Sequence, residues 1–178
     1  MSPDRAGDAE AEVEKATAGG ARFSAVTVLL GIVVALLSQF VTGYSLVDET
    51  DSVITTVTLA DTHGLITTVF AVVAAGALVF TVLAGSRSAA AVVVAMGIGI
   101  LLVFLIVDLP DVGETGFFIA PGVGNIDATG QASAGLWMEL VGGLVITLGG
   151  FALARLDEPR LRAIAAPDPD RSRGRVAP

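Results

Sequence analysis

Four polar side chains stand out because they lie in or beside long apolar stretches where ionisable groups are scarce. Gln39, His63 and Asp108 lie at the ends of three such stretches, and Glu139 lies about five residues inside a fourth. A carboxylic acid in such surroundings needs a partner or stays protonated. A His–Glu pair in a partly dry pocket can exchange a proton near neutral pH. One hypothesis is therefore a pH-sensitive or proton-linked site, with His63 and Glu139 titrating and Gln39 and Asp108 positioning them.

The second hypothesis gives the same residues a structural role. Glu139 would hydrogen-bond to a neighbouring helix or outer loop and lock the helices together, and His63 would cap a helix at the membrane interface. Polar residues near the ends of apolar helices commonly extend toward water. This behaviour favours the structural role.

The residue types give little support for a metal site, a cofactor site or an enzyme active site. The chain has no cysteine and one histidine, which argues against zinc and excludes disulfides and thiolate sites. Asp108, Asp111 and Glu114 are spaced at threes, but Pro110 and Gly113 interrupt them and the calcium-loop pattern is missing. No phosphate-binding loop, nucleophile elbow or H-E-x-x-H pair occurs. We expect a non-enzymatic protein with no metal and no cofactor.

The elements that must position these side chains are four apolar stretches of about 20 residues each. A helix that rises 1.5 Å per residue needs roughly this length to cross a bilayer core about 30 Å thick. Glu139 is the only ionisable residue inside them. The predicted spans are residues 23–42, 65–84, 89–107 and 134–154. The predicted fold is an all-α membrane protein with a four-helix transmembrane bundle over residues 23–155.

The basic residues predict the orientation of this bundle. All ten lie in residues 1–22, at Arg87 between the second and third spans, or after residue 154. The connections 43–64 and 108–133 contain no Lys or Arg and hold eight carboxylates. Because Lys and Arg favour the cytoplasmic side, both termini are expected in the cytoplasm. The net charge of −8 is an average over two sides with different charge, so it does not describe either surface, and no nucleic-acid partner is expected. Since nine of the ten basic residues are arginine and Ala, Gly and Val abound, we expect the plasma membrane of a bacterium with a GC-rich genome.

The remaining segments are predicted from their local patterns. Residues 1–22 are expected to form a disordered cytoplasmic tail, and 156–178 a mostly disordered one with a short helix over 156–166. The connection 108–133 holds five glycines and two prolines and is predicted to be a glycine-rich outer loop. Val53–Leu59 alternates like an extended strand. Asp61 is expected to cap the N-terminus of the second span.

Small residues predict which helix faces meet. Glycines repeat at seven-residue steps in the fourth span, and small residues repeat at four-residue steps in the third. The two sets are Gly135, Gly142 and Gly149, and Ala91, Ala95 and Gly99. Such faces let helices approach closely, within the bundle or between protomers. Glu139 shares the face of Gly135 and Gly142, so its side chain is expected to point inward.

The low polarity of the spans favours a structural function over transport. A solute path normally needs more inward polar groups than Gln39, His63 and Glu139. We expect an accessory or structural subunit of a membrane complex, which binds the lipid bilayer and either other membrane proteins or itself. The alternatives are a small oligomeric proton-linked transporter or channel, and an outward-facing pH or cation sensor.

Overall fold

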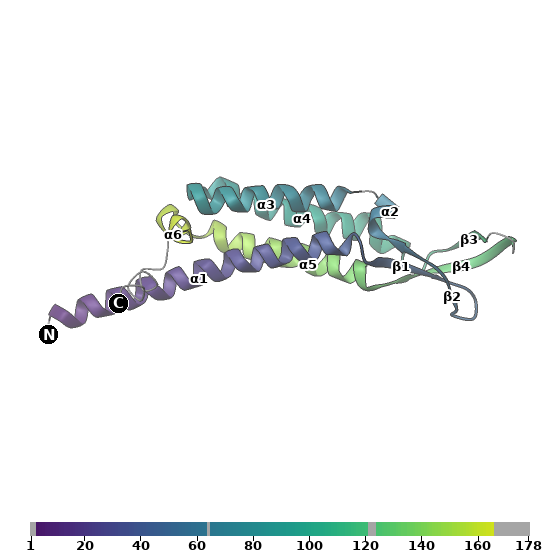
Figure 1. Cartoon of the computed structure of the whole chain (residues 1–178), viewed down its shortest axis with the longest axis horizontal. Coiled ribbons are helices and arrows are strands. Elements are labelled where there is room, and N and C mark those ends of the chain that lie inside the picture. Colours follow the sequence, from purple (N-terminus) through teal and green to yellow (C-terminus); the bar gives the residue numbers. More distant parts are fainter. Residues whose placement is uncertain (1–2, 64, 121–123, 166–178) are drawn as a thin grey trace, which may run out of the picture.

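The computed structural model describes residues 3–63, 65–120 and 124–165 (Figure 1). Side chains are described for residues 19–62, 65–116 and 127–165. Long helices lie side by side in an elongated bundle. A small β-sheet extends from one end, here called the sheet end. The N-terminus of α1 and the short helix α6 lie at the opposite end, here called the terminal end.

Four helices form the bundle, and each contains a segment long and apolar enough to span a membrane. They are α1 (Pro3–Ser38), α3 (Ile66–Ala84), α4 (Arg87–Val103) and α5 (Ala134–Ala154). The segments that meet the length and hydropathy requirement are Gly19–Ser38, Ile66–Ala84, Arg87–Asp111 and Ala134–Ala154. The prediction of four apolar helices at these places is confirmed.

Two of the helix ends differ from the prediction. α1 ends at Ser38 and not at residue 42, because Thr42 already begins a strand. α4 continues past its predicted end at residue 107 through a π-helical turn, Phe104–Asp108, and a 3₁₀ turn, Leu109–Asp111. The π turn adds a residue to the helical turn and reorients the side chains that follow.

The segments flanking the bundle are more helical than predicted. α1 begins at Pro3, so the backbone is helical where a disordered tail was expected. This stretch is rich in Ala and Glu, which have high helix propensity and continue the apolar helix that follows. In the C-terminal segment, α6 (Glu158–Ala163) lies within the range where a short helix was predicted.

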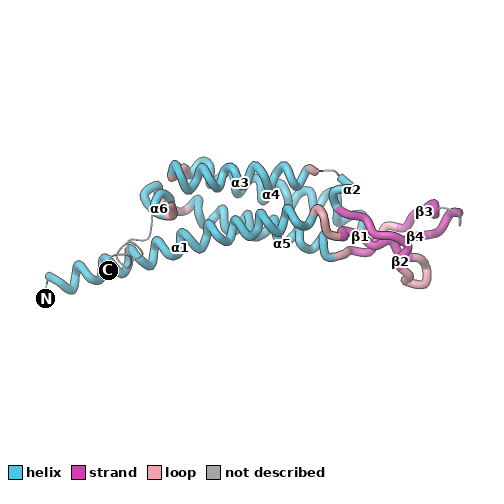
Figure 2. The backbone as a smooth tube through the Cα atoms, in the orientation of Figure 1, coloured by secondary structure: helices cyan, strands magenta, loops and turns pink. Residues whose placement is uncertain are grey.

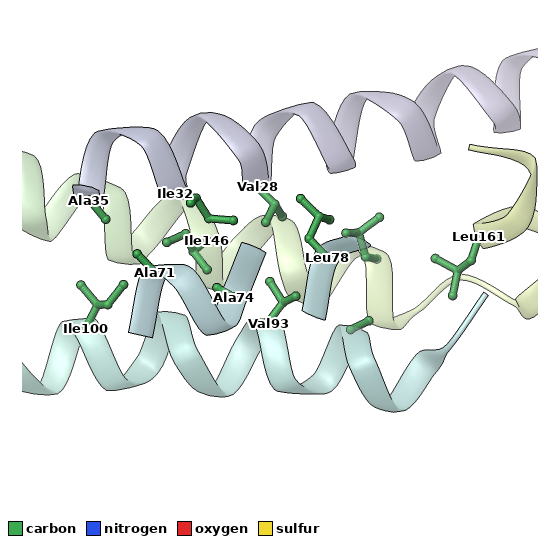
Figure 3. Packing of buried hydrophobic residues seen from close by; sticks show 12 residues of the cluster. Val28, Ile32, Ala35, Ala71, Ala74, Leu78, Val93, Ile100, Ile146 and Leu161 are labelled. Atoms are coloured by element: carbon green, nitrogen blue, oxygen red, sulfur yellow. The ribbon is translucent and has the colours of Figure 1, made fainter. Parts of the chain in front are cut away.

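The bundle has an apolar interior and an equally apolar exterior. Figure 3 shows side chains such as Val28, Ile32, Leu78 and Ile146 meeting between the helices, all of them buried. Large apolar side chains also cover the outside. The most exposed include Phe23, Phe80, Leu83, Ile106 and Leu148, each with at least 67% of its surface accessible. A water-soluble fold avoids such a continuous apolar surface.

α5 lies at the centre of the bundle and packs through glycines on two of its faces. On one face, a Cβ atom on Gly142 would lie 2.8 Å from the Ala35 nitrogen of α1. On the other, a Cβ atom on Gly150 would lie 2.9 Å from Val93 Cγ1 of α4. The backbones approach so closely that these positions admit no side chain.

The terminal end is closed by contacts between α6 and the turn that joins α3 to α4. Gly85 adopts the left-handed conformation (φ 67°), and Ser86 caps α4 by accepting a hydrogen bond from Ala89 N. Arg87 Nε donates to Leu156 O over 2.8 Å, and Arg162 Nε donates to Ala84 O over 3.3 Å. Leu161 of α6 is buried against the bundle (Figure 3).

The two outer connections pair with each other to form one antiparallel sheet, coloured magenta in Figure 2. Its strands are β1 (Thr42–Val47), β2 (Val53–Thr58), β3 (Thr115–Ala120) and β4 (Gly124–Ala132), in the order β2-β1-β4-β3. The all-α prediction is therefore wrong at this end, and the glycine-rich connection is not simply a loop. The central β1–β4 pairing joins distant parts of the chain, and local sequence patterns do not reveal it. The extended conformation predicted at Val53–Leu59 is confirmed over β2.

Asp61 does not cap the second span. It lies in a separate short helix, α2 (Leu59–His63), where its carboxylate accepts a 2.6 Å hydrogen bond from Thr58 Oγ1. The residue before α3 is Leu65, which makes no side-chain cap. The extra helical turn between β2 and α3 moves Asp61 away from the position predicted for it.

Candidate functional site

The predicted polar residues lie at the sheet end of the bundle, where three of them are fully buried. Gln39 follows the last turn of α1, Asp108 ends the π turn after α4, and Glu139 lies in the second turn of α5. Each of these three residues has 0% of its surface exposed. The backbone of His63 ends α2, but its side chain lies outside the described part of the chain. The predicted His63–Glu139 pair therefore remains a prediction.

Glu139 joins two helices. Gly135 and Gly142 lie one turn before and one turn after it on the same face of α5, which carries the carboxyl group into the bundle. Its Oε1 atom accepts a short hydrogen bond from Thr67 Oγ1 in the first turn of α3, and Thr67 is also fully buried. A hydrogen bond of this kind stabilises one arrangement of α3 against α5.

Asp108 joins the bundle to the sheet. Tyr44 Oη of β1 donates a 2.6 Å hydrogen bond to the Asp108 carbonyl oxygen and lies 3.3 Å from its Oδ1 atom. The π turn supplies this acceptor, because it brings Asp108 to the buried side of the helix. A second connection lies nearby, where Ser133 N donates to Gly43 O over 2.8 Å. These bonds fix the central strands of the sheet on the end of the bundle.

Tyr44 experiences a strongly negative environment. Burial raises the pKa of its phenol well above the ordinary value, and the negative charges of Asp108 and Asp111 raise it further. The carboxyl group of Glu139 acts in the same direction. The raised pKa keeps the Tyr44 phenol neutral as the donor to Asp108.

Gln39 forms a separate hydrogen-bonded group at the end of α1. Its Nε2 atom donates to Ser38 Oγ over 3.1 Å, and its backbone oxygen accepts from Ala60 N over 3.3 Å. Ser38 Oγ in turn donates to Ala35 O. Within the described residues, Gln39 Oε1 accepts no hydrogen bond. The bonds of Gln39 therefore connect α1 to the start of α2.

A pocket of about 370 Å³ lies between the sheet and the 3₁₀ turn. Tyr44 and Leu46 of β1 line it, together with the exposed carboxylates of Asp111 and Glu114. Tyr44 also bonds to Asp108, so one residue connects the pocket to that buried carboxyl group.

The predicted packing residues fall into two groups. Gly135, Gly142 and Gly149 lie against α1 and the chain that follows it, and a Cβ atom on Gly135 would lie 3.0 Å from Ser38 O of α1. In α4, Ala91 and Ala95 are instead exposed and do not face the neighbouring helices of the chain, so of the two predicted contacts the one between protomers stays a prediction.

The face of α4 that contacts α5 is not the face that carries Ala91, Ala95 and Gly99. Gly99 lies beside Phe70 of α3, and a Cβ atom added to Gly99 would lie 3.3 Å from the Phe70 ring. The face that meets α5 runs through residues 90, 93, 97 and 100, all of them buried. A four-residue small-residue pattern does not identify it, because valine and isoleucine alternate with the small residues on that face.

Two bonding partners were absent from the predicted site, Tyr44 and Thr67. Thr67 follows His63 by one helical turn, so helical periodicity indicates its face but not its bond to Glu139. Tyr44 reaches Asp108 because β1 begins at the end of the bundle where the turn after α4 ends, although the two residues are 64 positions apart in the chain. No local pattern signals such a contact.

The described side chains form no group of three or more His, Cys, Asp or Glu residues that could hold a metal ion. The hydrogen bonds of the cluster join α3 to α5 and β1 to the end of α4, so its clearest role is to fix those elements. Comparison with protein-family models, curated proteins and solved structures finds no match for this chain.

Proposed function

We propose that the chain is an integral membrane protein of a bacterial plasma membrane, with four transmembrane helices, the sheet outside and both termini in the cytoplasm. The apolar exterior of the bundle supports its placement in lipid. The distribution of charge supports the orientation. Basic residues flank the terminal end. The connections that form the sheet contain carboxylates but no Lys or Arg.

The absence of cysteine makes this topology easy to test. A single cysteine at Val53 on β2 is expected to react with a membrane-impermeant maleimide on intact cells. One at Arg160 on α6 is expected to react only after the membrane is permeabilised. Both side chains are exposed, so burial does not explain a difference between them. The reverse pattern would overturn the orientation, and labelling of both sites on intact cells would overturn the membrane placement.

Within that topology, we propose that the protein is a non-enzymatic accessory or structural subunit that presents the outer sheet to a partner. The observation that carries this proposal is the β1–β4 pairing, which joins two separate connections into one sheet. The Tyr44–Asp108 hydrogen bond holds that sheet against the bundle. A sheet fixed in this way offers a partner a surface of defined orientation.

The interior of the bundle supports a structural role over transport by a single chain. Between the Glu139 level and α6, the buried cluster consists of apolar side chains, among them Ile146, Ala74 and Leu78. Thr81 is buried in the same half, but its hydroxyl donates to Ala77 O of its own helix. The described interior therefore offers no continuous polar path from one end of the bundle to the other.

The sheet has two edge strands, β2 and β3. Edge strands expose backbone donors and acceptors that a partner strand can pair with. Val53 on β2 is also 60% exposed, which adds an apolar contact at that edge. We therefore place the partner on the sheet and not on the helices.

Site-specific photo-crosslinking in the native membrane tests this placement. A photoreactive residue at Val53 is expected to give an adduct with one protein, and that protein is expected to co-purify at a fixed ratio in mild detergent. The matched control is Leu148, which is 67% exposed on the outside of α5 and should give lipid adducts. A homogeneous preparation without partner, with no protein adduct from Val53, would overturn the accessory role.

A second candidate is an outward-facing pH or cation sensor. The observation that favours it is that Tyr44, which lines the pocket, is bonded to the buried residue Asp108. A sensor requires that external pH change the maleimide reactivity of a cysteine at Arg160, and that Glu139→Gln abolish the change. Proton-driven flux in liposomes would instead favour the transporter alternative.

A further inference from the structure

The pocket of about 370 Å³ beside Tyr44 opens on one face of the outer sheet. Tyr44 on β1 lies opposite Val57 on β2, and Leu46 on β1 lies opposite Gly130 on β4. Residues paired in this way, and residues two positions apart on one strand, point to the same side of a sheet. All four line the pocket, together with Ala128 of β4. The floor of the pocket is therefore an apolar sheet face that extends over β2, β1 and β4.

The chain covers this apolar face only in part. The 3₁₀ turn lies over β4, where a Cβ atom on Gly130 would come within 2.6 Å of Asp111 O. Leu46 and Val57, in contrast, remain half-buried. The polar side chain of Ser45, between Tyr44 and Leu46, points to the opposite face. The part of the sheet that stays open in the pocket is thus its apolar side.

The surroundings of the pocket are strongly acidic. Asp111 and Glu114 line it, and both are exposed. The connections 43–64 and 108–133 together hold eight carboxylates, one histidine and no Lys or Arg, so their net charge is negative whichever hydrogen bonds the individual carboxylates make. The arginines in the described part of the chain lie at the opposite, terminal end. The charge complementary to this face is therefore positive.

We propose that the pocket receives an arginine or lysine side chain from a basic, extended segment of a partner protein. This inference rests on the proposed function, in which the sheet is the surface that a partner binds. Arg and Lys have an apolar stem and a cationic head, so the stem covers the apolar floor while the head stays at the acidic rim. Val57 belongs to the edge strand β2, and a segment paired with that edge directs every second side chain to the pocket side.

The charge and lining argue against two other occupants. A second copy of the chain would bring the same carboxylates against this face, and like charges repel. A divalent cation such as Ca²⁺ takes six to eight oxygen ligands. The pocket floor is apolar, and the described side chains form no group of three or more possible metal ligands.

The proposed topology narrows the class of partner. Short outer loops of membrane proteins contain few Lys and Arg, whereas long translocated domains are not restricted in this way. The basic segment therefore belongs to an extracytoplasmic protein domain and not to a short loop of a neighbouring membrane protein.

The test uses the full chain in nanodiscs of zwitterionic lipid. The probe is a fluorescent peptide in which arginine alternates with threonine, and the control peptide has neutral citrulline in place of each arginine. Fluorescence anisotropy measures both affinities. The arginine peptide is expected to bind at least about ten-fold more tightly, as for hydrogen bonds to charged groups, and its affinity is expected to fall as salt is raised.

Two pairs of variants locate the site. Glu114→Gln is expected to weaken binding of the arginine peptide about five-fold, the upper value for one exposed ion pair. Asp127→Asn also removes one exposed carboxylate of the sheet, but Asp127 lines a different pocket, so the loss should be clearly smaller. Val57→Trp fills the pocket and is expected to abolish peptide binding. Thr56→Trp, one position earlier on β2 and on the opposite face, is expected to keep it. Circular dichroism and thermal unfolding check that each variant folds as the wild type does.

Four outcomes overturn the proposal. Equal binding of the two peptides would show that charge does not select the partner, and equal losses in Glu114→Gln and Asp127→Asn would show that the pocket is not the site. Spermidine binding as tightly as the arginine peptide would assign the pocket to a free amine. Displacement of the peptide by calcium chloride, but not by sodium chloride of the same ionic strength, would assign it to a divalent cation.

Crosslinking from Val53 separates this proposal from the accessory role. A protein adduct together with equal binding of the two peptides would leave the accessory role standing and overturn the basic partner. Selective binding of the arginine peptide without any protein adduct in the native membrane would overturn the accessory role alone.

Discussion

The two ends of the bundle are held together in different ways. Toward the terminal end, helices meet through apolar side chains and close backbone contacts, such as Gly149 against Val28. At the sheet end, buried hydrogen bonds join the elements, with Thr67 bonded to Glu139 and Tyr44 to Asp108. The first kind of contact depends on shape, and the second on the position of individual polar atoms.

This difference follows from what each end has to do. In lipid, burying an apolar side chain between helices brings no hydrophobic gain, so close packing must supply the attraction. A sheet outside the bundle needs more than attraction, because its strands have to sit in one register on the helix ends. Hydrogen bonds to buried groups define such an arrangement. We therefore expect substitutions in the glycine contacts to affect global stability most, and substitutions at the sheet end to affect the sheet most.

The largest effect is expected for Gly142→Leu at the α1–α5 contact. Its side chain would begin 2.8 Å from the Ala35 nitrogen, a backbone atom that cannot move without displacing α1. The expected loss in free energy of unfolding is at least about 3 kcal/mol, measured by denaturation in mixed micelles. Gly76→Leu on α3 is the control, since no atom lies within 4 Å of an added Cβ there. Similar losses in the two variants would show that the close contact with α1 is not responsible, since Leu favours the helix more than Gly at both positions.

An intermediate effect is expected for the Thr67–Glu139 hydrogen bond. Thr67→Val removes the donor at nearly constant volume, and Glu139→Leu removes the acceptor. A double-mutant cycle on these two changes is expected to give a coupling of about 0.6–1.7 kcal/mol, the range found for such bonds between membrane helices. Thr81→Val provides the comparison, because the Thr81 hydroxyl bonds within its own helix. Zero coupling would mean that the two side chains stabilise the bundle independently.

The same contrast between the two ends explains how far sequence alone could go. Long apolar stretches are a local signal, and they predicted all four helices. Helical periodicity also placed Glu139 on the glycine face of α5 with its side chain pointing inward, and Glu139 is buried. The inward face of α4 was missed, because on that helix exposed and buried positions are both filled by Ala, Val and Ile.

The sheet end was predicted poorly because its contacts are long-range. β1 and β4 meet although Ser45 and Ser133 are 88 positions apart, and the glycine-rich segment gives no strand pattern of its own. Gln39, Asp108 and Glu139 could be assigned to one end of the bundle by depth. Their hydrogen-bond partners could not be assigned, since these depend on the π turn before Asp108 and on the strand that carries Tyr44.

A smaller effect, dependent on pH, is expected for Tyr44→Phe. Loss of the bond to the Asp108 carbonyl should cost about 1 kcal/mol below pH 10. The raised pKa of Tyr44 means that the unfolded chain ionises near its ordinary value of 10.0 while the folded chain does not. Stability of the wild type should therefore be complete below that pH and fall as the pH rises toward the raised pKa.

The chain contains one tyrosine, so its absorbance reports on this group alone. Tyrosinate absorbance is expected to appear only as the wild type unfolds. The fall in stability between about pH 9 and about pH 11 should be smaller in Tyr44→Phe than in the wild type. Ionisation of Tyr44 in the folded protein near its ordinary value would show that the phenol is not buried beside carboxyl groups.

The smallest effect is expected at the β1–β2 turn, which lies farthest from the bundle contacts. Asp48 Oδ1 accepts hydrogen bonds from Thr50 Oγ1, Thr50 N and Ser52 N over 2.7–2.9 Å, and these bonds lower the pKa of Asp48. The order they give the turn is present above the ordinary value of 3.8 and lost as the pH falls through the lowered value. Thr50→Ala removes the hydrogen bond from Thr50 Oγ1, which lowers the pKa of Asp48 more than the other two do. The pKa of Asp48, followed by carboxyl NMR, should therefore rise toward 3.8. Global stability should not change. Thr56→Ala, on the exposed surface of β2, should leave the pKa of Asp48 unchanged. A loss of global stability in Thr50→Ala as large as that in Thr67→Val would contradict this prediction. The β1–β2 turn would then unfold in the same cooperative unit as the helices, and its hydrogen bonds would stabilise more than the turn itself.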